Sequence, residues 1–429
     1  MKNTKIAVIG LGYVGLPLFF ELSKHFDVKG FDINSNKIRE LRLKLDRNNI
    51  YSKNFFNKIN LKKFTDDYKH LIDRNVFIVC VPTPIKKNFN PDLKYLTNSS
   101  KLLGKIIKNG DIVVYESTVY PGCTEDHCIP ILEKFSRMKV LKNSEKKKGF
   151  YVCYSPERIN PGDNVHNLNN VVKVLSGLER NSTLLVKNIY NKIVKIGIHI
   201  AKDIKTAEAA KIIENTQRDL NIALVNEFSI IFEKLNINIG EVLKAAKTKW
   251  NFLNFKPGLV GGHCIGVDPY YLTYISKKNK YLPKTILSGR IINDNFYKFI
   301  IKKIFKEMKR LKINQSNSKI LIMGYTFKEN ISDFRNSKVK DLVNELIKKN
   351  VRISIFDPHV NLNLIKDKSI KNKFIKKRDL KKYDAIILTV PHKEFINYSQ
   401  KFYKSIVKKN FMIFDLKNAF KLKMKTITL

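Results

Sequence analysis

The sequence predicts an α/β protein with two Rossmann-like parallel-sheet domains, joined by a long central helix and a small helical domain. Three observations predict this fold class. Short apolar runs alternate with helical patterns in the first third of the chain, and the same alternation returns in the last third. Between them, residues 203–235 contain no glycine or proline. Apolar runs of this length between helices are typical of strands that are covered on both faces of a parallel sheet.

The first third contains five predicted strands. They are expected at residues 5–10, 27–33, 76–84, 111–118 and 151–156. A glycine-rich turn and a helix over about 14–24 follow the first strand. The polar stretch 141–150 predicts a surface loop. Together these elements predict a first domain over residues 1–200.

The middle third is predicted to be helical. Asp203 is a suitable N-cap residue, and apolar residues such as Ile204, Ala207 and Leu220 recur at helical spacing after it. A helix of about 30 residues would be about 45 Å long, which is too long for one small globule. We therefore expect a central domain over 201–312, whose long helix links two domains and packs against its copy in a homodimer.

The last third is expected to form a second parallel sheet, in a domain over 313–429. Its strands are predicted at 318–324, 351–358, 383–390 and 411–416. The first strand is followed by GYTFK, which has one glycine rather than three. A second dinucleotide site is therefore not expected, whereas a mononucleotide could bind at the strand ends.

Composition excludes several classes of protein. Hydrophobic residues make up 43% of the chain, which is enough to build cores. No stretch approaches the roughly 18 apolar residues of a membrane span. The start MKNTKIAVIG runs directly into a strand, without a signal peptide. These features predict a cytoplasmic protein with no membrane insertion. The five cysteines are odd in number and fit no zinc spacing, so neither a metal site nor a disulfide framework is expected.

The net charge of +43 is the unusual feature of the composition. A nucleic-acid-binding protein concentrates its basic residues on one arm or face. Here lysine is spread over nearly every segment, and arginine, the better reader of phosphate, is scarce beside it. We therefore expect no nucleic-acid partner. A basic nucleic-acid-binding protein remains the non-enzymatic alternative, and salt-dependent binding to one preferred sequence would favour it.

The glycine-rich turn after the first strand has the pattern of a dinucleotide site. It comprises Gly10, Leu11, Gly12, Tyr13, Val14 and Gly15. The first glycine allows a tight turn, and the second lets the backbone approach a pyrophosphate at the helix N-terminus. Asp32 ends the second strand about 20 residues further on, where a carboxylate binds a ribose 2′-hydroxyl and repels a 2′-phosphate. This arrangement predicts NAD as cofactor. The alternative is a glycine turn that binds no ligand.

Three glycines surround a cysteine in the segment 261–268. A thiolate at Cys264 could attack an aldehyde, and loss of hydride would then leave a thioester. The alternative is an ordinary buried thiol. His263 could act as a base for the thiol, although a lone histidine is more often structural. Asp268 lies four residues after the cysteine.

Three further polar residues are candidates for chemistry. Lys211 and Asn215 lie four residues apart on the long helix, so they share a face and could stabilise an oxyanion and hold a water. The alternative for this face is a solvated surface. Glu157 follows the fifth strand, where ligands bind in α/β sheets, and could be a general base. Equally, it could pair with Arg158 or cap a turn.

Seven ordered motifs resemble the UDP-glucose/GDP-mannose dehydrogenase family, and they cover essentially the whole chain. They are IGLGYVGLP (9–17), VPTP (81–84), ESTVYPG (116–122), YSPERINPG (154–162), AEAAKIIENTQRDLNIALVNE (207–227), KPGLVGGHCIGVDPYYL (256–272) and GYTFKENISDFRNS (324–337). The glucose and mannose branches usually carry GGSC followed by FPKD or LPKD. This chain has GGHCIGVDPYYL and ENTQRD instead, which resemble the branch that oxidises UDP-N-acetylhexosamines.

The resemblance also implies roles for individual residues. The implied catalytic residues are Cys264 as nucleophile, Asp268 as acid/base, Lys211 and Asn215 at the oxyanion, and Glu157 in thioester hydrolysis. The implied NAD contacts beyond the glycine turn are Asp32, Lys37, Thr83, Thr118 and Arg335. The implied substrate contacts are Glu157, Arg158, Lys211, Asn215, Gly258, Gly261, Gly262, Phe327 and Lys328.

The implied reaction is a four-electron oxidation of the C6 alcohol of UDP-N-acetylglucosamine or UDP-N-acetylgalactosamine, for surface polysaccharide biosynthesis. Covalent capture at Cys264 would keep the aldehyde from escaping. UDP-glucose is the alternative substrate. A two-domain hydroxy-acid dehydrogenase, which needs no cysteine and yields one NADH, is another alternative. A non-catalytic nucleotide-binding relative is disfavoured because every expected reactive residue is present.

Overall fold

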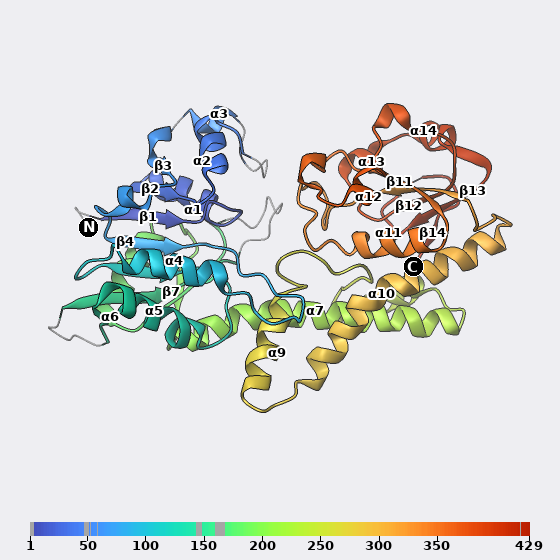
Figure 1. Ribbon diagram of the computed structural model, residues 1–429. Helices are drawn as coiled ribbons and strands as arrows, with labels where there is room; N and C mark the ends of the chain where they lie inside the picture. Colours follow the sequence, from blue (N-terminus) through green and yellow to red (C-terminus); the bar gives the residue numbers. More distant parts are fainter. Residues whose placement is uncertain are drawn as a thin grey trace. The chain divides into compact units, whose positions relative to one another are not determined.

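The computed structural model describes residues 4–46, 51, 53–57, 59–142, 148–158, 168–420 and 422–429. The chain divides into two compact units (Figure 1). The first unit comprises Met1–Asn215 and Tyr270–Leu282, and the second comprises Thr216–Pro269 and Pro283–Leu429. Within the described ranges, none of the helices has the length and apolarity to cross a lipid bilayer.

The first unit is built on one large sheet. In its described residues, the strands are β1 (Lys5–Ile9), β2 (Asp27–Phe31), β3 (Phe64–Thr65), β4 (Val76–Val79), β5 (Ile112–Tyr115), β6 (Lys139–Val140), β7 (Gly149–Tyr154), β8 (Lys173–Gly177) and β9 (Ile198–Ile200). Their order is β3-β2-β1-β4-β5-β7-β8-β9, with β6 beside β7. Strand β2 lies on one side of β1 and β4 lies on the other, so the order of the strands reverses at β1. Ligands bind at such a reversal of strand order in α/β sheets.

Helices flank this sheet and bury its apolar side chains. They are α1 (Gly15–Ser23), α2 (Ser35–Arg42), α3 (Lys53–Phe56), α4 (Lys94–Gly104), α5 (Ile129–Ser136) and α6 (Arg180–Tyr190). Ile6 and Val8 of β1 share a buried cluster with Phe19 and Phe20 of α1. The alternate residues Ala7 and Ile9 are also buried, so β1 is covered on both faces. This burial explains why β1 is a continuous apolar run.

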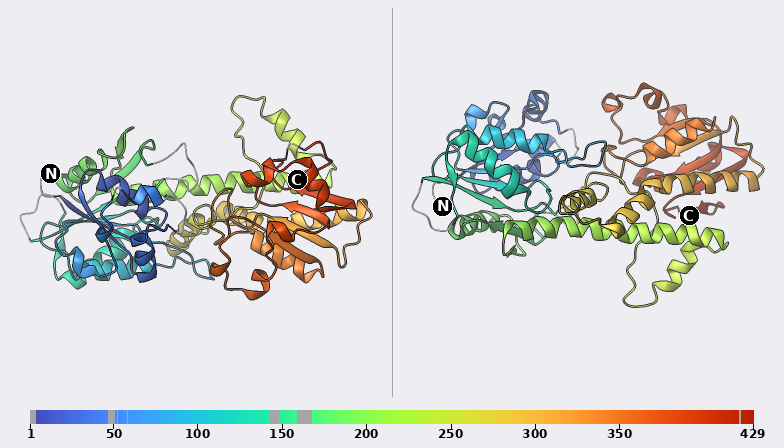
Figure 2. Two further views of the ribbon diagram at one scale, coloured as in Figure 1. Left: turned by 90° about the horizontal axis from the view of Figure 1, so that it is seen from above. Right: turned by 60° about the horizontal axis from the view of Figure 1, so that its bottom comes forward.

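One helix passes from the first unit into the second. Helix α7 (Ile204–Lys234) is 31 residues long and is drawn as one continuous helix in both views of Figure 2. Asp203 precedes it, and its carboxylate accepts a hydrogen bond of 2.7 Å from the Thr206 N–H. This is the N-cap contact that the sequence predicts.

The second unit contains a smaller sheet whose pairings are all parallel among the described residues. Its strands are β10 (Lys319–Met323), β11 (Arg352–Phe356), β12 (Tyr383–Leu388), β13 (Val407–Asp415) and β14 (Ile427–Thr428). The order β11-β10-β12-β13-β14 places its reversal between β10 and β12. The loops that follow these two strands therefore lie at the position where this kind of sheet binds ligands.

Strand alternation divides the second core into two layers. Ile320 and Ile322 of β10 pack with the helices α10 (Lys284–Arg310) and α11 (Val339–Lys348). Leu321 and Met323 pack on the opposite face with the helices α13 (Lys393–Asn397) and α14 (Gln400–Ser405). The remaining helices are α8 (Ile239–Ala246), α9 (Asp268–Lys278) and α12 (Lys368–Lys371).

The fold class predicted from the sequence is confirmed, with three differences in detail. Strand β8 pairs antiparallel with β7, so the first sheet is not wholly parallel. The short strands β3, β6, β9 and β14 were not predicted, because two or three residues carry too little periodicity to be recognised. The five-residue strand β8 was not predicted either. The predicted loop 141–150 is shorter than expected, because Gly149 and Phe150 are buried and open β7. Residues 143–147 of that loop lie outside the described residues.

Candidate functional site

The glycine turn after β1 has the backbone that a pyrophosphate site requires. Gly10 has a φ of +92°, which favours glycine. A Cβ at Gly15 would lie 1.9 Å from the Gly10 carbonyl oxygen, so the start of α1 needs glycine there. A Cβ at Gly12 would meet nothing within 4 Å, so this backbone faces open space. Helix α1 has no side-chain cap at its N-terminus. These features fit an anion at the turn.

Asp32 lies beside this turn, as predicted. Its Oδ2 accepts a hydrogen bond of 3.0 Å from the Leu11 N–H and forms an ion pair of 2.8 Å with Lys37 Nζ. Its Oδ1 accepts a hydrogen bond of 3.1 Å from the Asn34 N–H. Asn34 in turn caps α2 by accepting from the Lys37 N–H. The carboxylate is therefore held at the end of β2, where a ribose would be recognised in an NAD site.

Thr83 follows β4, which pairs with β1, and Thr118 follows β5, the next strand in the sheet. Both are partly exposed. The hydroxyl of Tyr271 donates hydrogen bonds to the carbonyl oxygens of Thr83 and Pro84, at 3.0 and 3.3 Å. Because parallel strands end at the same edge, the first unit brings these threonines to the same edge as the glycine turn.

Glu157 is buried just beyond β7, next to a charged cluster that the sequence did not reveal. Lys173 of β8 lies 3.1 Å from Glu116 Oε1 and 4.0 Å from Glu157 Oε2. The Tyr190 hydroxyl donates to the same Glu116 carboxylate. Burial raises the pKa of Glu116, although Lys173 opposes this. Burial lowers the pKa of Lys173, but the charges of Glu116 and Glu157 and the hydrogen bond to Glu116 together outweigh it, so the pKa is raised.

The side chain of Arg158 does not pair with Glu157. Its guanidinium lies 2.8 Å from Glu214 and donates to the Val172 carbonyl oxygen at 2.7 Å. The backbone N–H of Arg158 instead donates to Glu157 Oε1 at 2.6 Å. The predicted ion pair between Glu157 and Arg158 is therefore absent, and Glu157 contacts the backbone of Arg158 instead. Residues 159–162 of this motif lie outside the described residues.

Lys211 and Asn215 are buried in helix α7, with 8% and 6% of their surface exposed. The alternative of a solvated helix face is therefore wrong for both residues. A lysine is almost never this buried without a specific function or partner. Their proposed catalytic roles remain a prediction.

Cys264 differs from the other cysteines of the chain. All five cysteines are described, and Cys80, Cys123, Cys128 and Cys153 are buried, whereas Cys264 is partly exposed. Its carbonyl oxygen accepts hydrogen bonds from the N–H groups of Val267 and Asp268, at 3.0 and 2.8 Å. Asp268 is buried and begins helix α9. The alternative of a sealed structural thiol is therefore wrong.

A buried asparagine holds the glycine loop that precedes Cys264. The Asn226 side chain accepts from the Gly258 N–H at 2.8 Å and donates to its carbonyl oxygen at 3.1 Å. Asn226 also donates to Asn293, which donates to Asp219. Arg290 completes this buried network with an ion pair of 2.6 Å to Asp219. Sequence reasoning missed Asn226, although an asparagine in the middle of a helix is a signal for a specific partner.

The second unit brings the predicted substrate residues Gly261, Gly262 and Phe327 together. A Cβ at Gly262, which has a φ of +89°, would lie 2.7 Å from the Phe327 ring. A Cβ at Gly261 would lie 2.6 Å from the Asn336 carbonyl oxygen. Gly261 and Phe327 also line a small hollow, together with Lys417. The glycines therefore allow two loops to pack closely beside this hollow.

Arg335, His263 and Lys328 also lie in the second unit. Arg335 forms an ion pair of 2.7 Å with Asp333 and keeps 59% of its side chain exposed. His263 Nδ1 lies 3.6 Å from the same carboxylate, and its ring faces the edge of Phe327. Burial and the charge of Arg335 lower the pKa of His263. The packing of His263 beside Asp333 and Phe327 favours the structural interpretation of this residue.

The predicted site residues thus form two groups, one in each unit. The first unit holds the glycine turn, Asp32, Lys37, Thr83, Thr118, Glu157, Arg158, Lys211 and Asn215. The second holds Gly258, Gly261, Gly262, Cys264, Asp268, Phe327, Lys328 and Arg335.

Family models of known proteins cover most of the chain. Models of one family's domains match the chain at residues 4–194 for the NAD binding domain, 205–295 for the central domain and 321–422 for the UDP binding domain. The chain belongs to the UDP-glucose/GDP-mannose dehydrogenase family. It is an NAD-dependent nucleotide-sugar dehydrogenase, as the sequence predicts.

Individual relatives span nearly the whole chain. The UDP-N-acetyl-D-glucosamine 6-dehydrogenase of Pseudomonas aeruginosa is 46% identical over 97% of both chains. Protein CapL of Staphylococcus aureus is 46% identical over 97% of this chain and 96% of its own. The solved structure of a UDP-D-ManNAc dehydrogenase from Pyrococcus horikoshii superposes with a TM-score of 0.84, at 29% identity and 99% coverage of each chain.

Proposed function

We propose that this dehydrogenase oxidises the C6 alcohol of a UDP-N-acetylhexosamine to the uronic acid, for surface polysaccharide biosynthesis. The accessible Cys264 in a loop built of glycines is the observation that carries the proposal, since a covalent route needs an exposed thiol. The relatives that are named UDP-N-acetyl-D-glucosamine 6-dehydrogenases support an N-acetylhexosamine substrate. The UDP derivative of either N-acetylglucosamine or N-acetylgalactosamine is the proposed substrate.

The proposed chemistry runs through the sulfur of Cys264. NAD supplies the hydride acceptor in both oxidation steps. The Cys264 thiol adds to the C6 aldehyde to form a thiohemiacetal, and the second oxidation converts this to a thioester. Water then cleaves the C–S bond, which gives the carboxylate and returns the thiol. Each sugar consumes one water and two NAD, and releases two NADH and three protons.

Four other side chains are proposed to assist these steps. Lys211 and Asn215 would stabilise the oxyanions, and their burial strengthens such an interaction. Glu157 would take a proton from the attacking water, and Lys173 holds a positive charge 4.0 Å from its carboxylate. Asp268 would act as acid/base near the thiol. Phe327, Lys328 and the glycine loop would bind the UDP-sugar.

We also propose that the protein is cytoplasmic and forms a homodimer in which α7 packs against α7 of a second copy. Ile213, Leu224 and Ile231 of α7 are 56%, 47% and 45% exposed. Their spacings of eleven and seven residues put them on one side of a helix, as in helices that pack along their length. This exposed apolar stripe supports packing against a second copy.

The yield of NADH per sugar tests the proposed reaction. We expect two NADH per mole of UDP-N-acetylglucosamine or UDP-N-acetylgalactosamine, and slower turnover of UDP-glucose, measured by absorbance at complete conversion. Cys264→Ser should form no thioester by intact-protein mass spectrometry and should lose the four-electron reaction, with its thermal midpoint unchanged. One NADH per sugar, or wild-type turnover by Cys264→Ser, would contradict the mechanism. Faster turnover of UDP-glucose would identify UDP-glucose, rather than a UDP-N-acetylhexosamine, as the substrate.

A further inference from the structure

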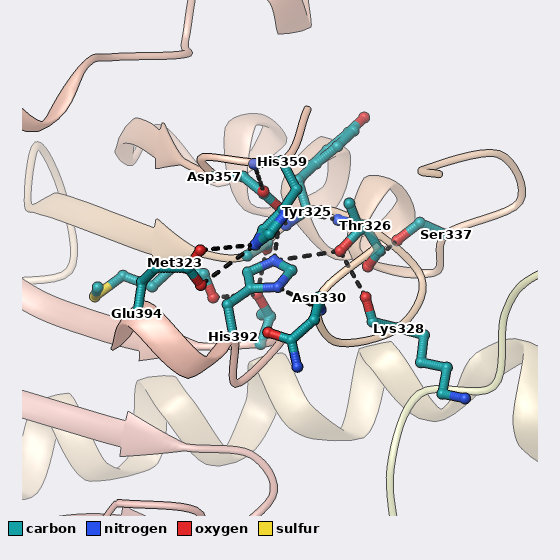
Figure 3. A network of polar contacts seen from close by, with 12 residues as sticks. Met323, Tyr325, Thr326, Lys328, Asn330, Ser337, Asp357, His359, His392 and Glu394 are labelled. Carbon is teal, nitrogen blue, oxygen red and sulfur yellow. Dashed lines mark hydrogen bonds and ion pairs between the residues drawn. The ribbon is translucent and has the colours of Figure 1, made fainter. Parts of the chain in front are cut away.

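We propose that His392 positions the loop 324–330, which carries Phe327 and Lys328, and thereby sets the affinity of the second unit for the UDP moiety of the sugar. This inference rests on the proposed function. The loop follows β10, and His392 lies in the segment after β12, so both lie where the strand order of the second sheet reverses. Figure 3 shows the network that joins them.

Asp357 anchors the beginning of the loop. It follows β11, and its side chain is fully buried. Its Oδ2 accepts hydrogen bonds from the N–H groups of Tyr325 and Thr326, at 2.6 and 3.1 Å. Its Oδ1 accepts from the His359 N–H at 2.8 Å. One carboxylate therefore satisfies two consecutive backbone donors where the chain leaves β10.

His392 connects this anchor to the far end of the loop. It has no exposed surface. Its Nδ1 lies 2.9 Å from the Asn330 backbone nitrogen, and a backbone N–H can only donate, so Nδ1 must accept. The ring proton is therefore on Nε2, which donates to Asp357 Oδ2 at 3.1 Å. The imidazole thus bridges the two ends of the loop in a single tautomer.

Asn330 is suited to this contact in two ways. Its φ of +59° lies in the left-handed region, which asparagine adopts more readily than most residues. Its Oδ1 accepts a hydrogen bond of 2.9 Å from the Lys393 N–H. Two hydrogen bonds therefore join Asn330 to residues 392 and 393. Within the loop, the Thr326 hydroxyl donates to the Lys328 carbonyl oxygen at 2.9 Å.

The residues between the two anchors are those proposed to bind the UDP-sugar. Phe327 packs against Gly262 and lines the hollow of the second unit. The Lys328 side chain extends away from the network in Figure 3, while its backbone is held by Thr326. If the Asn330 anchor is lost, the loop must be ordered again when UDP binds, and this ordering lowers the affinity. His392 is a positioning residue, because it acts through the loop.

Two substitutions at His392 separate its two hydrogen bonds. His392→Asn places a carbonyl oxygen at the position of Nδ1, so it keeps the acceptor for Asn330 and loses the donor to Asp357. His392→Gln places an amide donor at the position of Nε2, so it keeps the bond to Asp357 and loses the one to Asn330. Glutamine is the closer of the two to histidine in size, so a role in packing alone predicts the opposite order.

We expect His392→Gln to raise the dissociation constant for UDP and the KM for the UDP-sugar about tenfold, the effect of one lost hydrogen bond and loop ordering. His392→Asn should stay within about threefold of wild type. For both variants, kcat at saturating sugar and the affinity for NAD should be close to wild type. Calorimetric titration with UDP and NAD, together with initial rates, measures all four quantities.

Equal losses in the two variants, or wild-type UDP affinity in His392→Gln, would overturn this inference. If His392→Gln fails to fold, His392→Met replaces it, because methionine fills a similar volume and offers the Asn330 N–H no strong acceptor. That variant should bind UDP several-fold more weakly, and unchanged affinity overturns the inference as well. Failure of the proposed function is distinguishable: wild-type protein would then not bind UDP, or Phe327→Ala would leave UDP affinity unchanged.

Discussion

At the scale of single residues, the glycines of the turn after β1 have different tasks. A side chain at Gly15 would collide with the Gly10 carbonyl oxygen, whereas one at Gly12 would enter open space. We therefore expect Gly15→Ala to destabilise the protein by about 1–3 kcal/mol or more through overpacking. Gly12→Ala should leave stability unchanged and weaken NAD binding at least about tenfold, because its methyl group occupies the space of the pyrophosphate.

Thermal unfolding and NAD titration of both variants measure this difference. UDP binding serves as the control, since the glycine turn belongs to the first unit and the predicted UDP residues to the second. Wild-type NAD affinity in Gly12→Ala would show that the turn does not seat the cofactor.

At the scale of elements, the first turns of α7 hold the loop after β5. Glu208 is fully buried and accepts hydrogen bonds from the Gly122 and Thr124 N–H groups, at 2.5 and 2.9 Å. This loop carries Thr118. Burial raises the pKa of Glu208 to about 7 from its ordinary 4.5, although the backbone hydrogen bonds oppose it. The helix therefore holds the loop through a carboxyl group that titrates near neutral pH.

This raised pKa predicts a pH dependence of stability. The folded state binds the Glu208 proton more tightly than the unfolded state does, so its contribution is fully present below about pH 4.5 and is lost as pH rises to about 7. Between pH 5 and 8, the free energy of unfolding of wild type should fall relative to Glu208→Gln by about 2–3 kcal/mol. Denaturant unfolding at several pH values measures this difference. Glu227→Gln, at an exposed position of the same helix, is the matched control and should show no such change.

At the scale of the whole molecule, the family's NAD binding domain matches residues of the first compact unit, and its UDP binding domain matches residues of the second. A ligand that binds only one folded unit stabilises that unit, by about 2.7 kcal/mol at a hundred times its dissociation constant. We expect scanning calorimetry to show NAD raising the transition of the first unit and UDP raising that of the second. Gly12→Ala should reduce the first shift, and Phe327→Ala should reduce the second. A single transition raised equally by both ligands would mean that the units unfold as one.

Much of this molecule could be predicted from local patterns. The apolar run of β1, the glycine turn and the position of Asp32 predicted the NAD domain, because a buried strand and a left-handed turn restrict which residues fit. The positions of Lys211 and Asn215 on one helix face were also predictable, but their burial was not. A periodic pattern shows which residues share a face, and only the packing shows what covers that face. The three-domain division at 200 and 312 remains a prediction.

The sequence by itself determined the fold class, the family and the cofactor, since these depend on spacing over a few positions and on ordered motifs. Only the tertiary structure decided the antiparallel β8, the Glu116–Lys173 pair, the hold of Asn226 on Gly258 and the bridge from His392 to Asn330. Each of these joins groups that are far apart in the chain or pairs them across strands. A buried polar group must find a partner, but no local pattern names the residue that supplies it.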